Sequence, residues 1–262
     1  MARSLSSPDN PLVKHLRSLH ERAAREESGL MLLEGPHLLA EALAAGIMPE
    51  HVVFQQSWPL TSEGSALLSR AEAGGAVLLE ATEKILAGIS TTATAPPVIA
   101  AVPIPRSDGG GSTQPGLVVD GLQDPGNLGT IIRTAWGAGA GTIFTTKGTV
   151  DLYAPKVLRA AQGAHFHLLL RELDRDELLH LIQSEGWRLT VAEPMAPVPF
   201  WQAELREPCL IGIGGEARGL GADIIGAALE RVSIPLAPGV DSLNAGISAA
   251  VLLFELVRRR RA

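Results

Sequence analysis

Three loops rich in glycine or proline carry most of the side chains that could do chemistry in this chain. They span residues 124–129, 214–221 and 236–244, and each follows a short apolar segment of the kind that forms a buried strand. In an open α/β sheet, ligands bind beyond the carboxyl ends of the strands, so the three loops are expected to converge on one pocket. The candidate side chains in and beside them are Asn127, Arg133, Glu216, Ser242 and Asn244.

These candidates offer amides, a guanidinium, a carboxylate and a hydroxyl, all of which form hydrogen bonds. The set contains no histidine, cysteine or lysine nucleophile and no cluster of metal ligands, so no metal is expected. The pattern therefore favours the binding and positioning of a ligand over covalent or metal catalysis. Helix capping is an alternative role for Asn127, Ser242 and Asn244, because their residue types also favour the start of a helix.

Two other kinds of site can be weighed from the sequence. Residues 212–217 match the spacing of a dinucleotide-binding fingerprint. However, residues 218–221 do not favour the start of a helix, and no complete βαβ unit follows them. His165 and His167 would point to one face of a strand expected over residues 165–170, yet no third ligand lies near them. Neither a nicotinamide site nor a metal site is favoured.

The composition indicates a globular protein with a large core and no general affinity for nucleic acid. Hydrophobic residues make up 46% of the 262 residues, and the formal net charge is −6. Because binding to phosphates requires an excess of lysine and arginine, any contact with RNA must come from local basic patches. The single cysteine, Cys209, excludes an internal disulfide and lies in an apolar run, so a buried structural thiol is expected.

No feature of the sequence indicates a membrane protein or an exported one. The apolar runs are shorter than the ~20 residues that span a bilayer, and the first residues lack an apolar signal core. We therefore expect a cytoplasmic protein.

A glycine- and serine-rich stretch divides the chain into two expected domains. Residues 1–104 alternate helices and strands, which predicts a small α/β/α sandwich. Residues 105–116 form a linker, and residues 117–262 form a second α/β domain. Its last strands are expected over 210–214 and 232–236, and its last helix ends in four arginines that suit the negative end of the helix dipole.

The main basic feature of the first domain is a helix expected over residues 11–25, with an apolar stripe on its inner side. Its outer face supplies the candidates for RNA binding, which are Lys14, Arg17, Arg22 and Arg25. Glutamates interleave with these cations, so a solvated surface helix without a ligand is the alternative.

In sequence order, the three loops resemble the signature motifs of the SpoU/TrmH family of RNA ribose 2′-O-methyltransferases. Residues 124–135 are similar to the first motif, 210–220 to the second and 234–244 to the third. Residues 156–164 also resemble the family segment between the first two motifs. Since three motifs occur in the right order, the resemblance is specific.

The resemblance implies a C-terminal α/β domain whose tail is threaded through a loop to form a trefoil knot, which periodicity alone could not predict. It implies S-adenosyl-L-methionine as the cofactor and a homodimer with the last helix at the interface. The first domain looks like the ribosomal-protein-like domain of members that modify ribosomal RNA, so 2′-O-methylation of a ribose in ribosomal (23S) RNA is expected. A transfer-RNA methyltransferase, or a noncatalytic RNA-binding or ribosome-assembly protein on the same fold, is the alternative.

The family's roles carry over to the matching positions of this chain. Arg133 would be the base, or would hold the adjoining phosphate while it polarises the 2′-hydroxyl. Asn127 would orient Arg133 or the ribose, and Glu216 would pair with Arg133 or fix its own loop. Ser242 and Asn244 would line the catalytic side. The residues that the resemblance assigns to the cofactor are Gly214, Ile234, Leu236 and Leu243.

Three positions depart from the family pattern. Ala217 stands where the family usually has glycine, Gly246 replaces a usual small polar residue after Asn244, and Ala161-Gln162 replaces the more common Ser-Ala. None of the departures alters the candidate catalytic side chains, so an active enzyme is expected.

Overall fold

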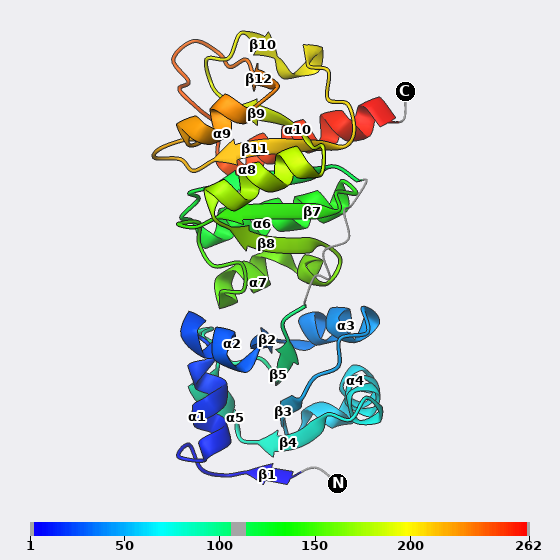
Figure 1. Ribbon diagram of the computed structural model, residues 1–262. Helices are drawn as coiled ribbons and strands as arrows, with labels where there is room; N and C mark the ends of the chain where they lie inside the picture. The colour runs from blue at the N-terminus through cyan, green and yellow to red at the C-terminus, as the bar shows by residue number, and fades with distance from the viewer. Residues whose placement is uncertain (1–2, 106–113, 261–262) are drawn as a thin grey trace. The chain divides into compact units, whose positions relative to one another are not determined.

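A computed structural model describes residues 3–105 and 114–260, which form two compact units (Figure 1). The first unit comprises residues 3–105 together with Tyr153–Phe166, and the second comprises the remaining described residues. Most of the predicted linker over 105–116 lies outside the described residues.

The first unit is built on a five-stranded mixed sheet with the strand order β1-β4-β3-β5-β2. Strand β5 runs antiparallel to both of its neighbours, and the other pairs are parallel. The sequence does not predict β1, because three residues are too few to show an alternation. The strands are β1 (Arg3–Leu5), β2 (Leu30–Glu34), β3 (His51–Gln55), β4 (Val77–Ala81) and β5 (Val98–Pro103).

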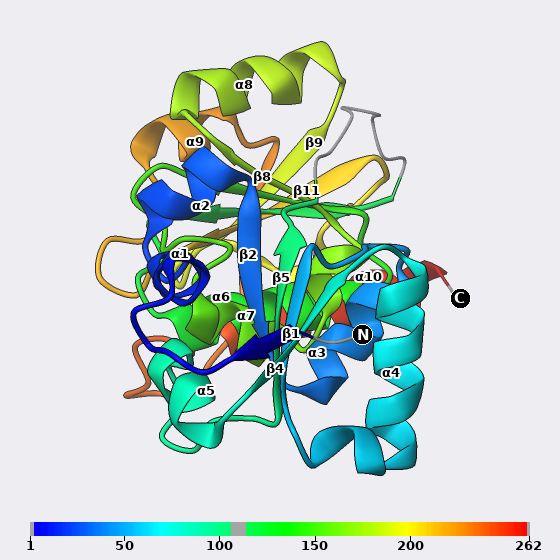
Figure 2. The same cartoon turned by 90° about the horizontal axis from the view of Figure 1, so that it is seen from below.

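Helices cover both faces of this sheet, as Figure 2 shows. Successive side chains of a strand point to opposite faces. In β2, Met31 and Leu33 join a buried cluster with α3 and α4, whereas Leu30 and Leu32 join a second cluster with α1 and α5. The predicted α/β/α sandwich is therefore confirmed. Its helices are α1 (Pro11–Ser18), α2 (Arg22–Ser28), α3 (Pro36–Ala44), η1 (Trp58–Leu60), α4 (Ser62–Ala73) and α5 (Glu83–Ile89).

The single helix predicted over residues 11–25 is wrong, because the chain forms two helices, α1 and α2, in this region. The Arg25 side chain lies at the break between them. Its Nη1 atom donates to the carbonyl oxygens of Leu19 and His20, at 2.7 Å each. These are acceptors that a continuous helix would satisfy internally, so the guanidinium replaces the missing helical hydrogen bonds.

Helix α7 (Pro155–Ala161) and the 3-10 turn η2 (Ala164–Phe166) pack in the first unit, although they follow strands of the second. Leu158 joins the buried cluster that contains α3. Arg159 pairs with the buried carboxylate of Glu34, with 3.2 Å between Nη1 and Oε1. The sequence does not predict this grouping.

The strand predicted over residues 165–170 is also wrong, since β8 begins at Leu169. His165 lies in η2 and is buried, and His167 is exposed and stacks on Trp136 with ring centroids 4.2 Å apart. The two histidines therefore do not alternate along a strand.

The second unit contains a seven-stranded parallel sheet with the order β10-β12-β9-β11-β6-β7-β8. Strand β12 ends at Ser233 rather than at the predicted Leu236, because Pro235 has no N–H group for the ladder. The strands are β6 (Gly116–Asp120), β7 (Thr142–Thr146), β8 (Leu169–Leu173), β9 (Arg188–Ala192), β10 (Val198–Pro199), β11 (Cys209–Gly214) and β12 (Glu230–Ser233).

Helices lie on both sides of this sheet as well, with α8 and α9 opposite α6 in Figure 2. Phe144, Leu178 and Ile224 belong to the core under α8 and α9, and α10 packs against α6 and β11. The threading of the tail stays a prediction. The helices are α6 (Pro125–Gly137), α8 (Arg175–Ser184), η3 (Phe200–Gln202), α9 (Ala222–Ala227) and α10 (Ala245–Arg260).

None of the helices in the described residues is both long enough and apolar enough to cross a membrane.

Candidate functional site

Helix α6 begins at Pro125, and its cap is Asp124 rather than Asn127. The Asp124 Oδ1 atom accepts a hydrogen bond from the Asn127 main-chain N–H at 2.7 Å, which is the usual geometry of an N-cap. Asn127 thus lies in the first helical turn, and its side chain is available for other partners. Capping does not account for this asparagine.

Three polar side chains from the three loops form one hydrogen-bonded chain. Asn244 Nδ2 donates to Asn127 Oδ1 at 2.8 Å, and Asn127 Nδ2 donates to a carboxylate oxygen of Glu216. Asn244 has a second role, since its Oδ1 accepts the N–H groups of Gly246 and Ile247 at the start of α10. The convergence of the three loops, predicted from their positions after strands, is present in the structure.

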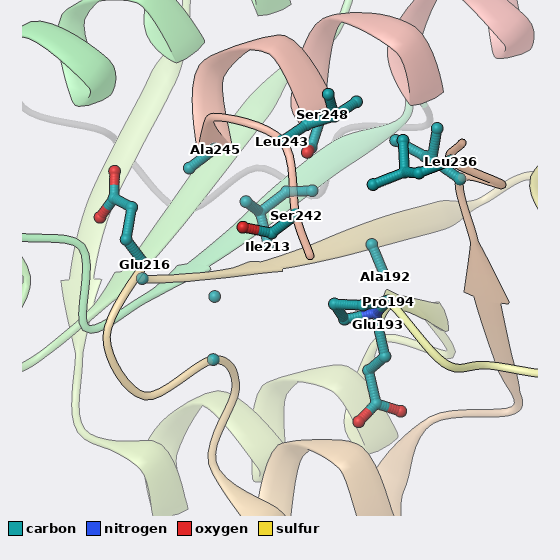
Figure 3. A pocket seen from close by; sticks show the side chains of 14 residues that line it. Ala192, Glu193, Pro194, Ile213, Glu216, Leu236, Ser242, Leu243, Ala245 and Ser248 are labelled. Atoms are coloured by element: carbon teal, nitrogen blue, oxygen red, sulfur yellow. The ribbon is translucent and has the colours of Figure 1, made fainter. Parts of the chain in front are cut away.

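A pocket of about 230 Å³ lies beside this chain, at the carboxyl ends of β9, β11 and β12 (Figure 3). All four residues that the sequence assigns to the cofactor line it, and so do two of the expected catalytic residues. The six are Gly214, Glu216, Ile234, Leu236, Ser242 and Leu243. Asn127, Asn244 and Arg133 are not among its lining residues.

The closeness of the loops depends on glycine at position 214. A Cβ atom added there would lie 2.2 Å from the main-chain carbon of Gly219, which is far inside any allowed contact. Any larger residue would push the second loop away from the strand that carries it. The wall of the pocket therefore requires Gly214 for space.

The part of the pocket that follows β9, namely Ala192, Glu193 and Pro194, is not predicted from the sequence. In Figure 3 these residues lie across the pocket from Glu216. No motif marks them, but they end a strand of the same parallel sheet, and that position was the available signal. Glu193 also pairs with Arg231 of β12.

Arg133 is exposed on α6, two turns after the helix start, and Thr130 lies between it and the pocket end of the helix. Within the described part of the chain, its guanidinium has no hydrogen bond or ion pair. Glu216 bonds to Asn127 rather than to Arg133. The carboxylate thus holds the second loop against α6, and the guanidinium is left for a ligand.

The departure at Gly246 has a structural reason. A Cβ atom at this position would lie 3.2 Å from Asn244 Oδ1 and 3.3 Å from Thr130 Cγ2. Glycine therefore lets α10 lie close to α6 without disturbing the Asn244 cap. The departure at Gln162 also fits, because this residue closes α7 in the left-handed region (φ 51°) and donates to the Arg159 carbonyl.

Cys209 is buried in β11, and burial raises the pKa of its thiol to about 11. The expectation of a buried structural thiol is confirmed.

The basic residues of the N-terminal helices are largely engaged within the protein. Lys14 pairs with Asp9 at 3.2 Å, Arg22 pairs with Glu26 at 2.7 Å, and Arg17 Nε donates to the Gly88 carbonyl at 2.8 Å. Arg25 is only 3% exposed, so its assignment to RNA binding is contradicted and its role is structural. The first three remain at the surface, where their pairs are weak and can exchange partners.

These features define a class of protein. A parallel α/β sheet carries a largely apolar pocket at its carboxyl edge, and amides and a carboxylate border the pocket on one side. In residues 3–105 and 114–260, no group of three or more histidine, cysteine or acidic side chains could hold a metal ion. Such a site suits a transferase that binds a reactive cofactor and orients a second substrate beside it.

The particular family follows from comparison with known proteins. Residues 115–254 match the SpoU rRNA Methylase family, and residues 10–100 match the MRM3-like substrate binding domain. The chain belongs to the SpoU rRNA methylase family. The family resemblance, the S-adenosylmethionine cofactor and the class of RNA 2′-O-ribose methyltransferase are thereby confirmed.

Individual relatives extend the match to nearly the whole chain. An uncharacterized tRNA/rRNA methyltransferase of Synechocystis sp. is 35% identical over 98% of this chain and 94% of its own length. The 23S rRNA guanosine 2′-O-methyltransferase RlmP of Bacillus subtilis is 29% identical, with 97% of this chain and 99% of RlmP covered. The AdoMet-bound rRNA methyltransferase of Sinorhizobium meliloti superposes with a TM-score of 0.89 at 26% identity, covering 100% and 99% of the two chains.

Proposed function

We propose that this protein transfers a methyl group from S-adenosylmethionine to a ribose 2′-hydroxyl of ribosomal RNA, most specifically 23S RNA. The observation that carries the proposal is the hydrogen-bonded chain Asn244–Asn127–Glu216 at the edge of the cofactor pocket. Similarity to RlmP over nearly the full length of both chains supports ribosomal RNA as the substrate class.

The pocket fits the adenosyl group in shape and chemistry. Ile213, Ile234, Leu236 and Leu243 give it apolar walls for a flat base, and the loop at Gly214 exposes main-chain groups for hydrogen bonds. We assign the cofactor to this pocket, with Ser242 on the side that faces the catalytic residues.

The mechanism rests on positioning. The bound cofactor supplies a methyl group on a sulfonium, which makes the carbon electrophilic without a metal. The three-residue chain fixes the three loops at the edge of the pocket, and alignment of the 2′-oxygen with the methyl group would supply much of the rate. Asn127 and Asn244 hold their amides in one orientation, so the catalytic side of the pocket is organised before the RNA binds.

Arg133 is an exposed cation that can contact the RNA backbone near this site. A guanidinium has a pKa above ~12 and rarely gives up its proton, so holding the adjoining phosphate and polarising the 2′-hydroxyl is the chemically easier role. Bidentate hydrogen bonds from a guanidinium suit a phosphate. That Arg133 has no partner among residues 3–105 and 114–260 supports this assignment over a structural one.

The first unit is proposed to bind the RNA, which agrees with its match to a substrate binding domain. We propose Lys14, Arg17 and Arg22 as surface residues that contact the RNA. The buried Arg25 is not among them. A cytoplasmic location agrees with this substrate and stays a prediction, and so does the trefoil threading of the second unit.

The experiment that tests the proposed function measures binding and turnover separately. Calorimetric titration with S-adenosylmethionine should show one site, and Arg133→Ala should keep that binding while it abolishes transfer of tritiated methyl to ribosomal RNA. Wild-type protein that binds no cofactor would favour the noncatalytic RNA-binding alternative. Retained turnover by the variant would refute both roles of Arg133.

The substrate is identified by mapping ribose methylation in RNA from cells with and without the gene, using mass spectrometry. Loss of one 2′-O-methyl group from 23S RNA is the expected result. Loss from a transfer RNA instead would establish the alternative substrate.

A further inference from the structure

Asp120, at the end of β6, bonds to both ends of the loop that carries Glu216, to one end through its main-chain oxygen and to the other through its buried carboxylate. Its main-chain oxygen accepts from Gly215 N at 2.8 Å, and its side-chain Oδ2 accepts from Gly221 N at 2.7 Å. Asp120 is 1% exposed. One residue thus holds the first and the last N–H groups of residues 215–221.

Side chains from two other elements, α8 and β7, fix the orientation of this carboxylate through hydrogen bonds. Arg175, at the start of α8, donates through Nε and Nη2 to Oδ1 at 3.3 and 3.1 Å, and through Nη2 to Oδ2 at 3.0 Å. The Thr146 hydroxyl of β7 donates to Oδ1. A buried carboxylate with this many donors has one stable position, because any rotation would leave a buried polar group without a partner.

The loop itself is packed tightly onto this network. Gly219 N donates to Gly215 O at 2.9 Å, and Leu220 is buried in the core under α8 and α9. A Cβ atom on Gly221 would lie 2.8 Å from Arg175 Cζ and 2.5 Å from Asp223 Oδ1. The end of the loop therefore lies directly against the guanidinium that orients Asp120.

We propose that Asp120 is a positioning residue for methyl transfer, and this rests on the proposed function. It does not touch the pocket. It holds the loop so that Gly214, Glu216 and Gly219 form the pocket wall and Glu216 reaches Asn127. The competing explanation is that Asp120 only stabilises the junction of β6, β7 and α8.

Cofactor affinity and stability separate the two explanations. Asp120→Ala removes the bond to Gly221, so the dissociation constant for S-adenosylmethionine should rise about tenfold or more and kcat should fall, with KM for RNA little changed. Leu181→Ala, a core truncation on α8, should lower the melting temperature as well but leave the dissociation constant within about threefold of wild type. If Asp120→Ala and Leu181→Ala lower the melting temperature equally and also weaken S-adenosylmethionine binding equally, the proposal is overturned.

A conservative variant adds a rescue test. Asp120→Asn keeps an oxygen for Gly221 N at the Oδ2 position, but its NH₂ group then takes the Oδ1 position, where the Thr146 hydroxyl can turn and accept while the Arg175 Nε and Nη2 donors lose their acceptor. Because the bond to Gly221 is retained, its cofactor affinity should lie between those of wild type and Asp120→Ala. If Asp120→Ala is folded and binds and turns over like wild type, the proposal fails.

Arg175→Met decides the matter if Asp120→Ala does not fold. Arg175→Met leaves the buried Asp120 carboxylate without its charged partner, so it should lower the melting temperature and weaken cofactor binding several-fold. Lys147→Met is the matched control, because the exposed Lys147–Asp174 pair lies at the start of the same helix and does not contact the loop. Unchanged binding by Arg175→Met would overturn the proposal. Failure of wild type to bind S-adenosylmethionine would instead refute the proposed function itself.

Discussion

At the scale of single residues, the direction of the hydrogen bonds in the site is set by Asn244. Its Oδ1 accepts the N–H groups of Gly246 and Ile247, so its Nδ2 must be the atom that faces Asn127. The Asn127 oxygen then faces Asn244, and its NH₂ group faces Glu216. A helix cap thus determines which way both amides point, and the proposed catalytic side uses the same residue as the cap.

This directionality predicts the effect of Asn127→Asp. The new carboxylate would face Glu216, and the repulsion of two carboxylates favours a shared proton at low pH. Turnover should fall about a hundredfold at pH 8, and the deficit relative to wild type should shrink at pH 6. Tritiated-methyl transfer at both pH values, with cofactor affinity measured in parallel, checks this. A ratio of variant to wild type that does not change with pH would contradict it.

The residues of the site that could be predicted are those in loops with unusual composition. Gly214, Glu216 and Asn244 lie in glycine- or proline-broken stretches that the sequence marks clearly. Glu193 could not be found in the same way, since it follows an ordinary strand and becomes part of the pocket only through the pairing of β9 with β11 and β12.

At the scale of elements, the apolar runs of the strands could be predicted from the sequence, whereas helix continuity could not. Strand β2 is apolar at four successive positions because its two faces meet different helix layers. The break between α1 and α2 could not be predicted, since it depends on Arg25 turning inward to the carbonyls of Leu19 and His20. A periodicity argument treats such an arginine as part of the exposed face.

Arg25→Met should therefore lower the free energy of unfolding by roughly 1–3 kcal/mol, because two carbonyls would lose a charged donor in a buried position. Urea unfolding gives the measurement. Arg22→Met is the matched control on the same helix, and its exposed pair with Glu26 should contribute less than about 0.5 kcal/mol. Equal effects of the two variants would show that the Arg25 contacts are not needed for the break.

The end of α10 holds a second buried ionic group, Glu255, whose side chain is 7% exposed. Arg258 donates to both of its carboxylate oxygens at 2.8 Å, and Arg259 donates to Oε1 at 2.7 Å. Arg259 also donates to the main-chain oxygens of Trp201 and Ala203. The C-terminal arginines, expected only to suit the helix dipole, thus tie α10 to the segment around η3.

Hydrogen bonding by Arg258, followed by that of Arg259, lowers the pKa of Glu255 from 4.5 to about 2. A carboxyl group with a depressed pKa stabilises the fold above its unfolded pKa, and this contribution is lost as the pH falls from about 4.5 toward 2. Glu255→Gln should cost roughly 1–3 kcal/mol at pH 7 and little at pH 2. Urea unfolding at several pH values tests this. A constant difference between variant and wild type across that range would contradict it.

At the scale of the whole chain, the meeting of the loops depends on sheet order rather than on sequence order. Strand β11 lies between β9 and β6, so Gly214 pairs with Asp120 although the two residues are far apart in the sequence. No local pattern contains this pairing, and only the general rule that loops after strands of an α/β sheet share one edge predicts that the loops converge. The grouping of α7 with the first unit also depends on contacts far along the chain, such as Arg159 with Glu34.

The surface of α10 bears on the proposed homodimer. Ile247 and Phe254 are each 52% exposed on this helix, one near its start and one in its second half, while Leu252 and Leu253 are buried against the unit. Trp136 at the end of α6 is also partly exposed. Because α6 and α10 pack together, these apolar side chains lie on adjoining elements, and a second copy of this chain is the occupant that the family resemblance implies.

If this face is the dimer interface, Phe254→Asp should convert the protein to a monomer, since a charge would be buried at a two-fold contact without a partner. Leu60→Asp is the control, because Leu60 is 87% exposed on η1 and is not part of α6 or α10. Sedimentation of both variants at several concentrations measures the change. Because the Phe254 side chain is half-exposed in the single chain, its replacement should leave the melting temperature of the monomer nearly unchanged. A Phe254→Asp variant that stays dimeric would place the interface elsewhere on the surface.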